Sequence, residues 1–258
     1  MNSLKKALSY SLRPHELGYC GPHDTDVSPA AAKAMAGRQK KIRDYLSGEP
    51  ISEEEIRIFL DEFRGAVAYY KLIARKNNIA DYYDERVVEA YWLGNELLDT
   101  ITVSDIATMA RVEFVGPGFL TKDVMEEKIS KFPSGQSSLR AAPKIGSAHH
   151  TFHLFFIGAT TGRVVLTEDR IDKCRPGWGE VKEIVPAENK VICKITRLFP
   201  MEVETETEII WDKLFVPELK VGDMVSHHWG RVSEKITDKQ LANLKKYTMI
   251  NFRALMNK

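Results

Sequence analysis

Residues 221–230 read VGDMVSHHWG, and this stretch carries the strongest indication of the fold. It joins a Gly-Asp turn, a short apolar run and two histidines, a pattern that predicts a short β-strand with one buried face. An earlier stretch, residues 174–181 (CRPGWGEV), also combines a turn, a strand pattern and one metal-binding side chain, here a thiol. A small barrel that brings Cys174 and His228 together would form a docking site for iron or nickel.

Outward from these two stretches, the second half of the chain is predicted to be rich in β-structure. Thr237 and Gln240 form a capping-box pair, which predicts a final helix after the last strand. Short strands separated by turns predict a small, OB-like barrel, so we expect residues 148–258 to form a barrel domain with a trailing helix. The strands are expected at residues 151–157, 163–166, 180–185, 190–198, 206–216 and 223–229, the first two as a hairpin.

The first half of the chain is predicted to be helical, which makes the fold class α+β. Apolar residues recur at helical spacing and follow capping residues. Residues 1–132 are therefore expected to form a helical domain that begins with an irregular arm, and residues 133–147 a linker to the barrel. The helices are expected at residues 28–46, 52–70, 84–98, 104–112 and 121–131.

Composition excludes several classes of function. Lys and Arg (37) nearly balance Asp and Glu (36), and no basic stripe suggests nucleic-acid binding. No segment approaches the roughly 18 apolar residues of a membrane span, and the N-terminus does not resemble a secretory signal, so we expect a cytoplasmic protein. Three cysteines without a CxxC pair argue against a disulfide framework and against a zinc site of the usual spacing.

The two stretches together resemble a known family. Cys174 is followed at offsets of five and seven residues by Gly179 and Val181, as in the family's opening of Cys, three residues, Pro and Gly-x-Val. Val-Gly-Asp, a Val and His-x-Gly then follow in that family's order, ending at His228 and Gly230. Residues 174–252 therefore resemble the HypC-type chaperones of NiFe-hydrogenase maturation, whereas the N-terminal region resembles nothing that we recognise.

The resemblance implies a small barrel with a C-terminal helix and a protein that does no chemistry alone. It implies that the Cys174 thiolate holds an Fe(CN)2(CO) fragment and that His228 is the second essential group, since thiolate suits low-spin iron and imidazole can assist. The implied partner is a hydrogenase large subunit or a scaffold protein of maturation. The family's cysteine is N-terminal, whereas Cys174 is internal, and Trp178 stands where the family has proline.

Two further groups of side chains are candidate ligands. His149, His150 and His153 form the densest histidine cluster, and the β-rich composition after them predicts a strand. On a strand His149 and His153 would share a face but lie about 13 Å apart, too far to share one ion; a helix or a bulge would bring two of the three together. In the arm, residues 13–22, His15 and Cys20 are candidates because irregular polar segments often line sites.

Three functions remain open from the sequence. The first is an assembly chaperone for a NiFe hydrogenase or related metalloenzyme, which binds its client and an iron fragment through Cys174 and His228. The second is a metal-dependent enzyme or metal-binding protein that uses the histidines of residues 149–153. The third is an interaction module without metal. Nucleotide-binding and hydrolase motifs are absent from the sequence, and catalysis is not established.

Overall fold

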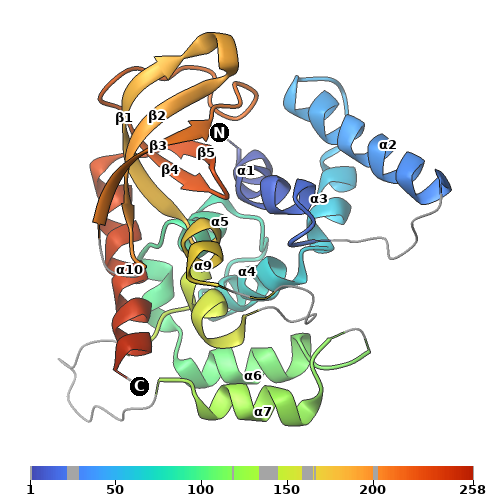
Figure 1. Ribbon diagram of the computed structural model, residues 1–258. Helices are drawn as coiled ribbons and strands as arrows, with labels where there is room; N and C mark the ends of the chain where they lie inside the picture. The colour runs from blue at the N-terminus through green and yellow to red at the C-terminus, as the bar shows by residue number, and fades with distance from the viewer. Residues whose placement is uncertain are drawn as a thin grey trace.

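The computed structural model describes residues 2–21, 29–117, 119–133, 145–158, 165, 167–199 and 203–257. Within this part of the chain, helices make up the first two thirds and a five-stranded barrel with a C-terminal helix the remainder (Figure 1). The α+β class with a small barrel is therefore confirmed. The helices are α1 (Ser3–Glu16), α2 (Pro29–Leu46), α3 (Glu53–Asp61), α4 (Arg64–Lys76), α5 (Glu85–Trp92), α6 (Val103–Glu113), α7 (Lys122–Ser130), α8 (His150–Phe152), α9 (Glu168–Cys174) and α10 (Asp238–Met256), with 3-10 turns η1 (Glu96–Thr100) and η3 (Pro186–Glu188) and a π-helix, η2 (His153–Ile157).

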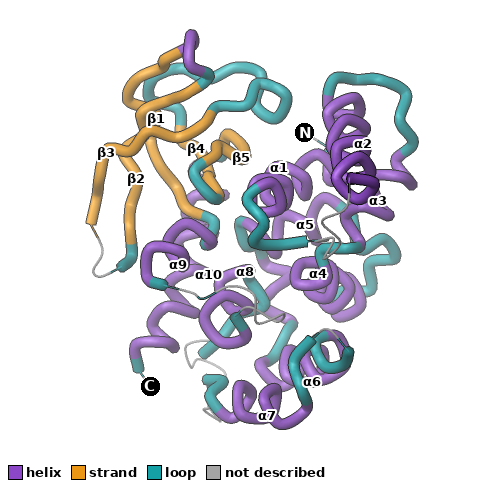
Figure 2. Tube along the Cα trace, turned by 45° about the vertical axis from the view of Figure 1, so that its right-hand side comes forward, coloured by secondary structure: helices purple, strands orange, loops and turns teal. Residues whose placement is uncertain are grey.

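The barrel consists of β1 (Gly177–Val185), β2 (Lys190–Arg197), β3 (Val203–Ile210), β4 (Met224–His228) and β5 (Arg231–Lys235). Its strand order is β1-β2-β3-β5-β4, and β1 pairs with β4 to close it. Neighbouring strands are antiparallel except β3 and β5, which meet in parallel at Ile210 and Arg231. Figure 2 shows the strands gathered on one side of the molecule and most helices on the other.

Helix starts follow the capping chemistry of the sequence. The Thr237 side chain accepts from the Gln240 backbone N–H while the Gln240 side chain accepts from Thr237 N, so the predicted capping box of α10 is present. Ser52 likewise accepts from Glu55 N at the start of α3. These bonds satisfy backbone donors that a helix start otherwise leaves unpaired, which is why these two starts were predictable.

The predicted hairpin before the barrel is wrong. Residues 151–157 are helical, because His149 caps the backbone of Thr151 and the segment packs among α7, α9 and α10. β-branched and aromatic residues favour a strand, but a segment buried on most sides loses the periodicity that separates strand from helix. Of its expected partner, residues 163, 164 and 166 lie outside the described residues, and Val165 belongs to no strand.

Other predicted boundaries also shift. The helix expected over residues 52–70 is two helices, because Phe63 leaves helical geometry (ψ 62°) between α3 and α4. β3 ends at Ile210 instead of continuing to residue 216, and β5 was not predicted at all. Most of the expected linker, residues 134–144, lies outside the described residues.

The arm is only partly irregular. Residues 3–16 form α1 despite Pro14 in its last turn, which corrects the prediction that the arm is irregular from residue 13. α1 contacts α3 and α5 on one side and β4 and β5 on the other. Within it, Tyr10 stacks on Trp92 with ring centroids 4.6 Å apart and also bonds Ser226 of the barrel at 2.6 Å. The helical part and the barrel therefore share one continuous core.

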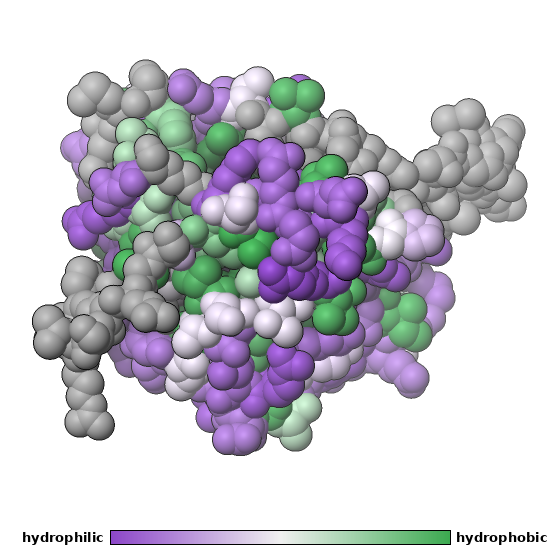
Figure 3. All heavy atoms as spheres, turned by 90° about the horizontal axis from the view of Figure 1, so that it is seen from below, coloured by the Kyte–Doolittle hydropathy of each residue, from purple (hydrophilic) through white to green (hydrophobic). Residues whose placement is uncertain are grey.

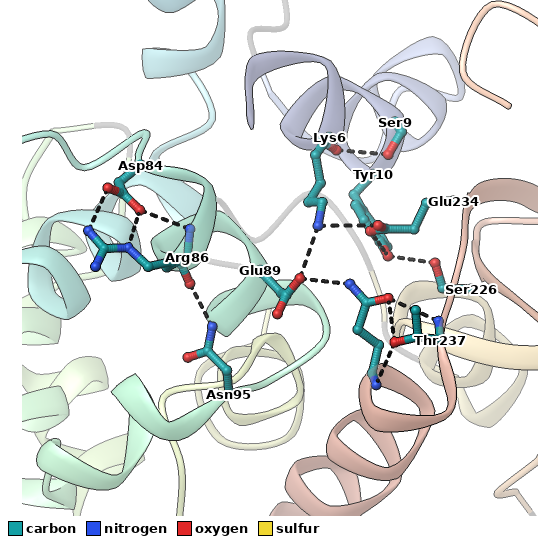
Figure 4. A network of polar contacts seen from close by, with 11 residues as sticks. Lys6, Ser9, Tyr10, Asp84, Arg86, Glu89, Asn95, Ser226, Glu234 and Thr237 are labelled. Carbon is teal, nitrogen blue, oxygen red and sulfur yellow. Dashed lines mark hydrogen bonds and ion pairs between the residues drawn. The ribbon is translucent and has the colours of Figure 1, made fainter. Parts of the chain in front are cut away.

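A buried polar network fixes the same junction (Figure 4). The Lys6 ammonium lies 3.2 Å from Glu234 of β5 and 3.3 Å from Glu89 of α5. The Tyr10 hydroxyl donates to Glu234 at 2.9 Å, and Gln240 of α10 donates to Glu89 at 2.7 Å. Lys6 and Glu234 are both buried, and a buried charge is unfavourable without a partner of opposite charge. The network therefore holds α1, α5, α10 and the barrel together.

The molecular surface seen from below carries hydrophilic side chains with apolar residues between them (Figure 3). Val112 of α6, Val124 of α7 and Met256 of α10 are among the exposed apolar residues of the described chain. Exposed apolar side chains that are scattered singly are normal for folded proteins and indicate no docking surface by themselves.

Gly94 ends α5 and offers a test of the packing between α5 and α10. Its φ is +83°, and an added Cβ would lie 2.2 Å from the Tyr247 ring of α10. We expect Gly94→Ala to lower the free energy of unfolding by about 2 to 4 kcal/mol, from backbone strain plus overpacking. Urea denaturation measures this. Gly48→Ala, with φ +90° and no atom within 4 Å, carries the strain alone and should cost only about 1 to 2 kcal/mol; equal losses in both variants would contradict the packing contribution.

Candidate metal centre

Cys174 is the last residue of α9, so the prediction that it begins a turn-and-strand unit needs correction. α9 is held to the end of β2 by Asp172, which accepts from the Arg175 guanidinium at 2.8 Å and from Leu198 N at 3.0 Å. The Arg175 side chain, buried over the Trp178 ring, also donates to a β2 carbonyl. These contacts hold Cys174 beside the mouth of the barrel.

The Cys174 thiol is buried, with the residue 7 % exposed among Leu154, Trp229 and partly buried neighbours. Burial raises its pKa well above that of a free thiol, and the negative charge of a Cys20 thiolate would raise the pKa further. The nearby Trp229 indole lowers the pKa of the Cys174 thiol. Its N–H makes no hydrogen bond of ordinary geometry with the described residues. Without a cation beside it, the thiol is therefore protonated at neutral pH.

The β4–β5 turn brings His228 to this thiol. Trp229 and Gly230 both have positive φ, 51° and 72°, as in a type I′ hairpin turn. Trp229 N donates to Lys173 O at 2.8 Å, which fixes the turn against α9. As a result, His228 Nε2 lies 2.6 Å from the Cys174 carbonyl oxygen, and Nδ1 lies 2.7 Å from the carbonyl oxygen of Tyr10.

His150 approaches the same point from the helical part. Its Nε2 lies 3.0 Å from the Cys174 carbonyl oxygen and 3.8 Å from the Cys174 sulfur, and its Nδ1 lies 2.9 Å from the Tyr91 hydroxyl. One ligand atom each of His150, Cys174 and His228 lies within 4.8 Å of the other two, and all three residues are buried. The structure therefore gathers one sulfur and two imidazole nitrogens at the junction of helices and barrel.

Burial keeps these imidazoles neutral. It lowers the pKa of His228 to about 4, with weaker opposing effects from the two carbonyl oxygens that it faces. Burial, followed by the neighbouring imidazoles His228 and His153, lowers the pKa of His150 well below its ordinary value. Neutral imidazole is the form that binds metals, and imidazole and thiolate together suit the later first-row transition metals.

The other histidines of residues 149–153 do not join the cluster. His149 caps α8 and its Nε2 contacts the carbonyl oxygen of Trp92. The His153 ring packs edge-on against Tyr69 and Phe114, with its centroid 6.4 Å from that of His150. The predicted arrangement, with His149 and His153 sharing a strand face, is wrong, because the segment is helical.

The neighbouring His227 takes the other side of β4, as expected for successive residues of a strand. Its ring packs against Gly177, where an added Cβ would lie 2.2 Å from it. Burial first, and Arg175 second, lower its pKa to about 3. The structure thus points one histidine of the pair, His228, toward Cys174.

The end of the arm lies over the cluster. Tyr19 stacks on Trp229 with ring centroids 4.3 Å apart. Cys20 is exposed as a whole residue, yet desolvation raises the pKa of its thiol to about 11. His15 instead packs edge-on against Phe59 and Phe63, with ring centroids 5.5 and 5.7 Å away. Of the two arm candidates, Cys20 therefore lies near the cluster and His15 packs on the helices.

Three supporting residues were not singled out from the sequence as part of a site. Tyr10 and Tyr91 hold the Nδ1 atoms of the two imidazoles, and Trp229 covers the sulfur. Such outer partners orient metal-binding histidines, but Tyr10 and Tyr91 come from distant helices and carry no local motif.

The fold and the cluster define the chain as an α+β protein with a small closed barrel and a buried site of one cysteine and two histidines. No helix in the described ranges is long and apolar enough to cross a membrane. The chain belongs to the family of unknown function DUF6390, whose profile matches residues 7–258 and thus both the helical part and the barrel. No curated protein and no solved structure matches it.

Proposed function

We propose that this protein is an assembly protein for a NiFe hydrogenase or a related metalloenzyme, and that it binds its client and an iron fragment through Cys174 and His228. One observation carries the proposal: the Cys174 sulfur and a ring nitrogen of His228, far apart in the chain, lie within 4.8 Å of each other, and both residues are buried. The resemblance of residues 174–252 to HypC-type chaperones supports it, since that region forms a closed barrel followed by a helix.

Burial of the site bears on how the protein would work. A thiol with a raised pKa deprotonates only when a cation arrives, so loading releases a proton and the metal stays bound while the site is closed. Transfer to a client then requires that the cover formed by Trp229 and Tyr19 move aside. Docking of the client at the barrel mouth supplies the binding energy for that movement.

Infrared spectroscopy tests the iron-fragment role. The chain co-expressed with cyanide-forming maturation factors should show bands of bound cyanide and carbon monoxide. Cys174→Ala should abolish the bands, because it removes the sulfur ligand, whereas Cys193→Ala should keep them, because Cys193 lies inside the barrel away from the cluster. Bands that survive Cys174→Ala would contradict the assignment.

Capture of a hydrogenase large-subunit precursor by the tagged chain tests the client role separately. Client capture without diatomic bands or metal would favour an interaction module without metal. A stoichiometric metal without diatomic bands and without client would favour a metal-dependent enzyme or metal-binding protein. Cys20→Ala examines the arm: unchanged metal and client binding would exclude Cys20 as a ligand.

A further inference from the structure

We propose that His150 is a third protein ligand of this centre, so that a divalent late first-row transition metal is held by Cys174, His228 and His150 together. The inference rests on the proposed function for its metal and adds a ligand from the helical part of the chain. It makes the centre a joint product of both parts, because neither supplies the full ligand set.

The distances between the ligand atoms favour one shared ion. Ligands bound at about 2.0 to 2.3 Å from one ion lie roughly 3.3 to 3.7 Å from one another in tetrahedral geometry. The Cys174 sulfur and His150 Nε2 are 3.8 Å apart, and no pair of the three ligand atoms is more than 4.8 Å apart. Small side-chain rotations would therefore close the set around an ion.

The hydrogen-bond partners of the His228 ring independently indicate a bound cation. Its two ring nitrogens face carbonyl oxygens, of Tyr10 at 2.7 Å and Cys174 at 2.6 Å. Carbonyl oxygens only accept, while a neutral imidazole has one N–H. When Nδ1–H donates to Tyr10, the Nε2 lone pair is directed at another lone pair. A metal bound at Nε2 would remove that repulsion by drawing the lone pair to itself.

His150 permits a metal at Nε2 but does not require one. When the Tyr91 hydroxyl donates its single proton to Gly65 O at 3.1 Å, His150 Nδ1–H donates to the Tyr91 oxygen. His150 Nε2 then presents a lone pair to the Cys174 carbonyl at 3.0 Å. Turning the hydroxyl toward His150 instead lets Nε2–H donate to the Cys174 carbonyl, because Gly65 O is already paired within α4, so the unavoidable proton deficit is the one at His228.

Protonating His228 does not resolve its deficit. A buried imidazolium ion would be strongly unfavourable without a counter-charge, and within the described residues the ring nitrogens of His228 face only the carbonyl oxygens of Tyr10 and Cys174. A metal ion would take up the Nε2 lone pair of His228, and that of His150 in the tautomer that donates from Nδ1, and would let each Nδ1–H keep its partner. Nδ1 partners of this kind, Tyr91 and the Tyr10 carbonyl, are the usual outer support of metal-binding histidines.

Three protein ligands also fit the proposed cargo. An iron ion that carries two cyanides and one carbon monoxide has three positions left in a six-coordinate sphere. Cys174, His150 and His228 would fill them, whereas a cysteine and one histidine would leave one position to solvent or to the client.

Titration of the purified full chain with Co²⁺, followed by its absorption, tests the proposal. The wild type should bind one Co²⁺ with ligand-field bands and a thiolate-to-cobalt band. His150→Gln should weaken binding at least about 100-fold, beyond the 10- to 100-fold typical of losing an outer partner. Tyr91→Phe, which leaves all three ligands, should weaken it about 10- to 100-fold. The matched control His149→Asn keeps a side chain able to cap α8 and should bind as the wild type does.

Each outcome decides. Wild-type affinity in a folded His150→Gln protein would overturn His150 as a third ligand. If Cys174→Ala nevertheless lost binding, the proposed pair of Cys174 and His228 would remain supported. Failure of the wild type to bind Co²⁺ would also overturn it, and client capture would then test the assembly role by itself. If His150→Gln does not fold, Tyr91→Phe decides, because unchanged affinity there would remove the support for His150.

Discussion

Acidification from pH 7 to pH 5 should lower the free energy of unfolding of the metal-free protein by about 2 kcal/mol for each of three buried imidazoles. These belong to His149, His227 and His228, whose pKa values burial lowers to about 4, 3 and 4. A depressed folded-state pKa gives stability that is complete above the unfolded pKa of 6.5 and is lost as the pH falls toward 4. The combined loss of about 6 kcal/mol is comparable to the whole stability of a typical domain.

Urea denaturation at a series of pH values measures this loss. Glu234 opposes it, because burial raises the pKa of this carboxyl despite Lys6 and thereby favours the folded state on acidification. His149→Asn, which keeps a capping side chain, should reduce the pH-dependent loss by about 2 kcal/mol. A free energy of unfolding that stays constant between pH 7 and pH 5 would show that the imidazoles are not neutral and buried.

Replacing Lys6 by methionine should destabilise the protein by about 3 to 5 kcal/mol, the second large effect that we expect. The Lys6 ammonium is the cation that both Glu234 and Glu89 contact, at 3.2 and 3.3 Å (Figure 4). These carboxylates outweigh burial and raise the pKa of Lys6. Lys6→Met keeps most of the apolar stem but leaves Glu234 buried without its counter-charge, so the carboxyl must take up a proton or the junction must loosen.

A double-mutant cycle separates this electrostatic effect from packing. Glu234→Gln keeps an acceptor for the Tyr10 hydroxyl and removes the charge, so Lys6→Met combined with Glu234→Gln should be more stable than Lys6→Met alone. Lys40→Met is the matched control, because Lys40 is exposed and pairs with Asp44 on the same helix; it should cost less than about 1 kcal/mol. Equal losses for Lys6→Met and Lys40→Met in urea denaturation would contradict the role of the buried network.

Much of the barrel was predictable from local sequence. Strands β1, β2 and β4 lie where alternating residues and turns place them, and α10 begins at the capping box of Thr237 and Gln240. In the helical part, Ser52 and Thr121 cap helices near the predicted starts. These features depend on neighbours within about four residues, so the local sequence is sufficient to predict them.

Segment 150–157 shows where such reasoning fails. Thr151 and the aromatic residues after it favour a strand, yet tertiary packing makes the segment helical and turns His150 toward Cys174. The strand prediction separated the histidines by alternation, whereas the helix places the rings of His150 and His153 6.4 Å apart. The error in the element was therefore also an error in the site.

The sequence by itself determined the fold class and the presence of a small barrel, because local periodicity and short motifs encode them, whereas Cys174 and His228 were selected together through a resemblance. Only the tertiary structure decided that His150 stands beside them and that Tyr10, Tyr91 and Trp229 enclose them. Those residues come from α1, α5, α8 and the β4–β5 turn, and no local rule relates segments that meet only when helices and barrel bury a common core.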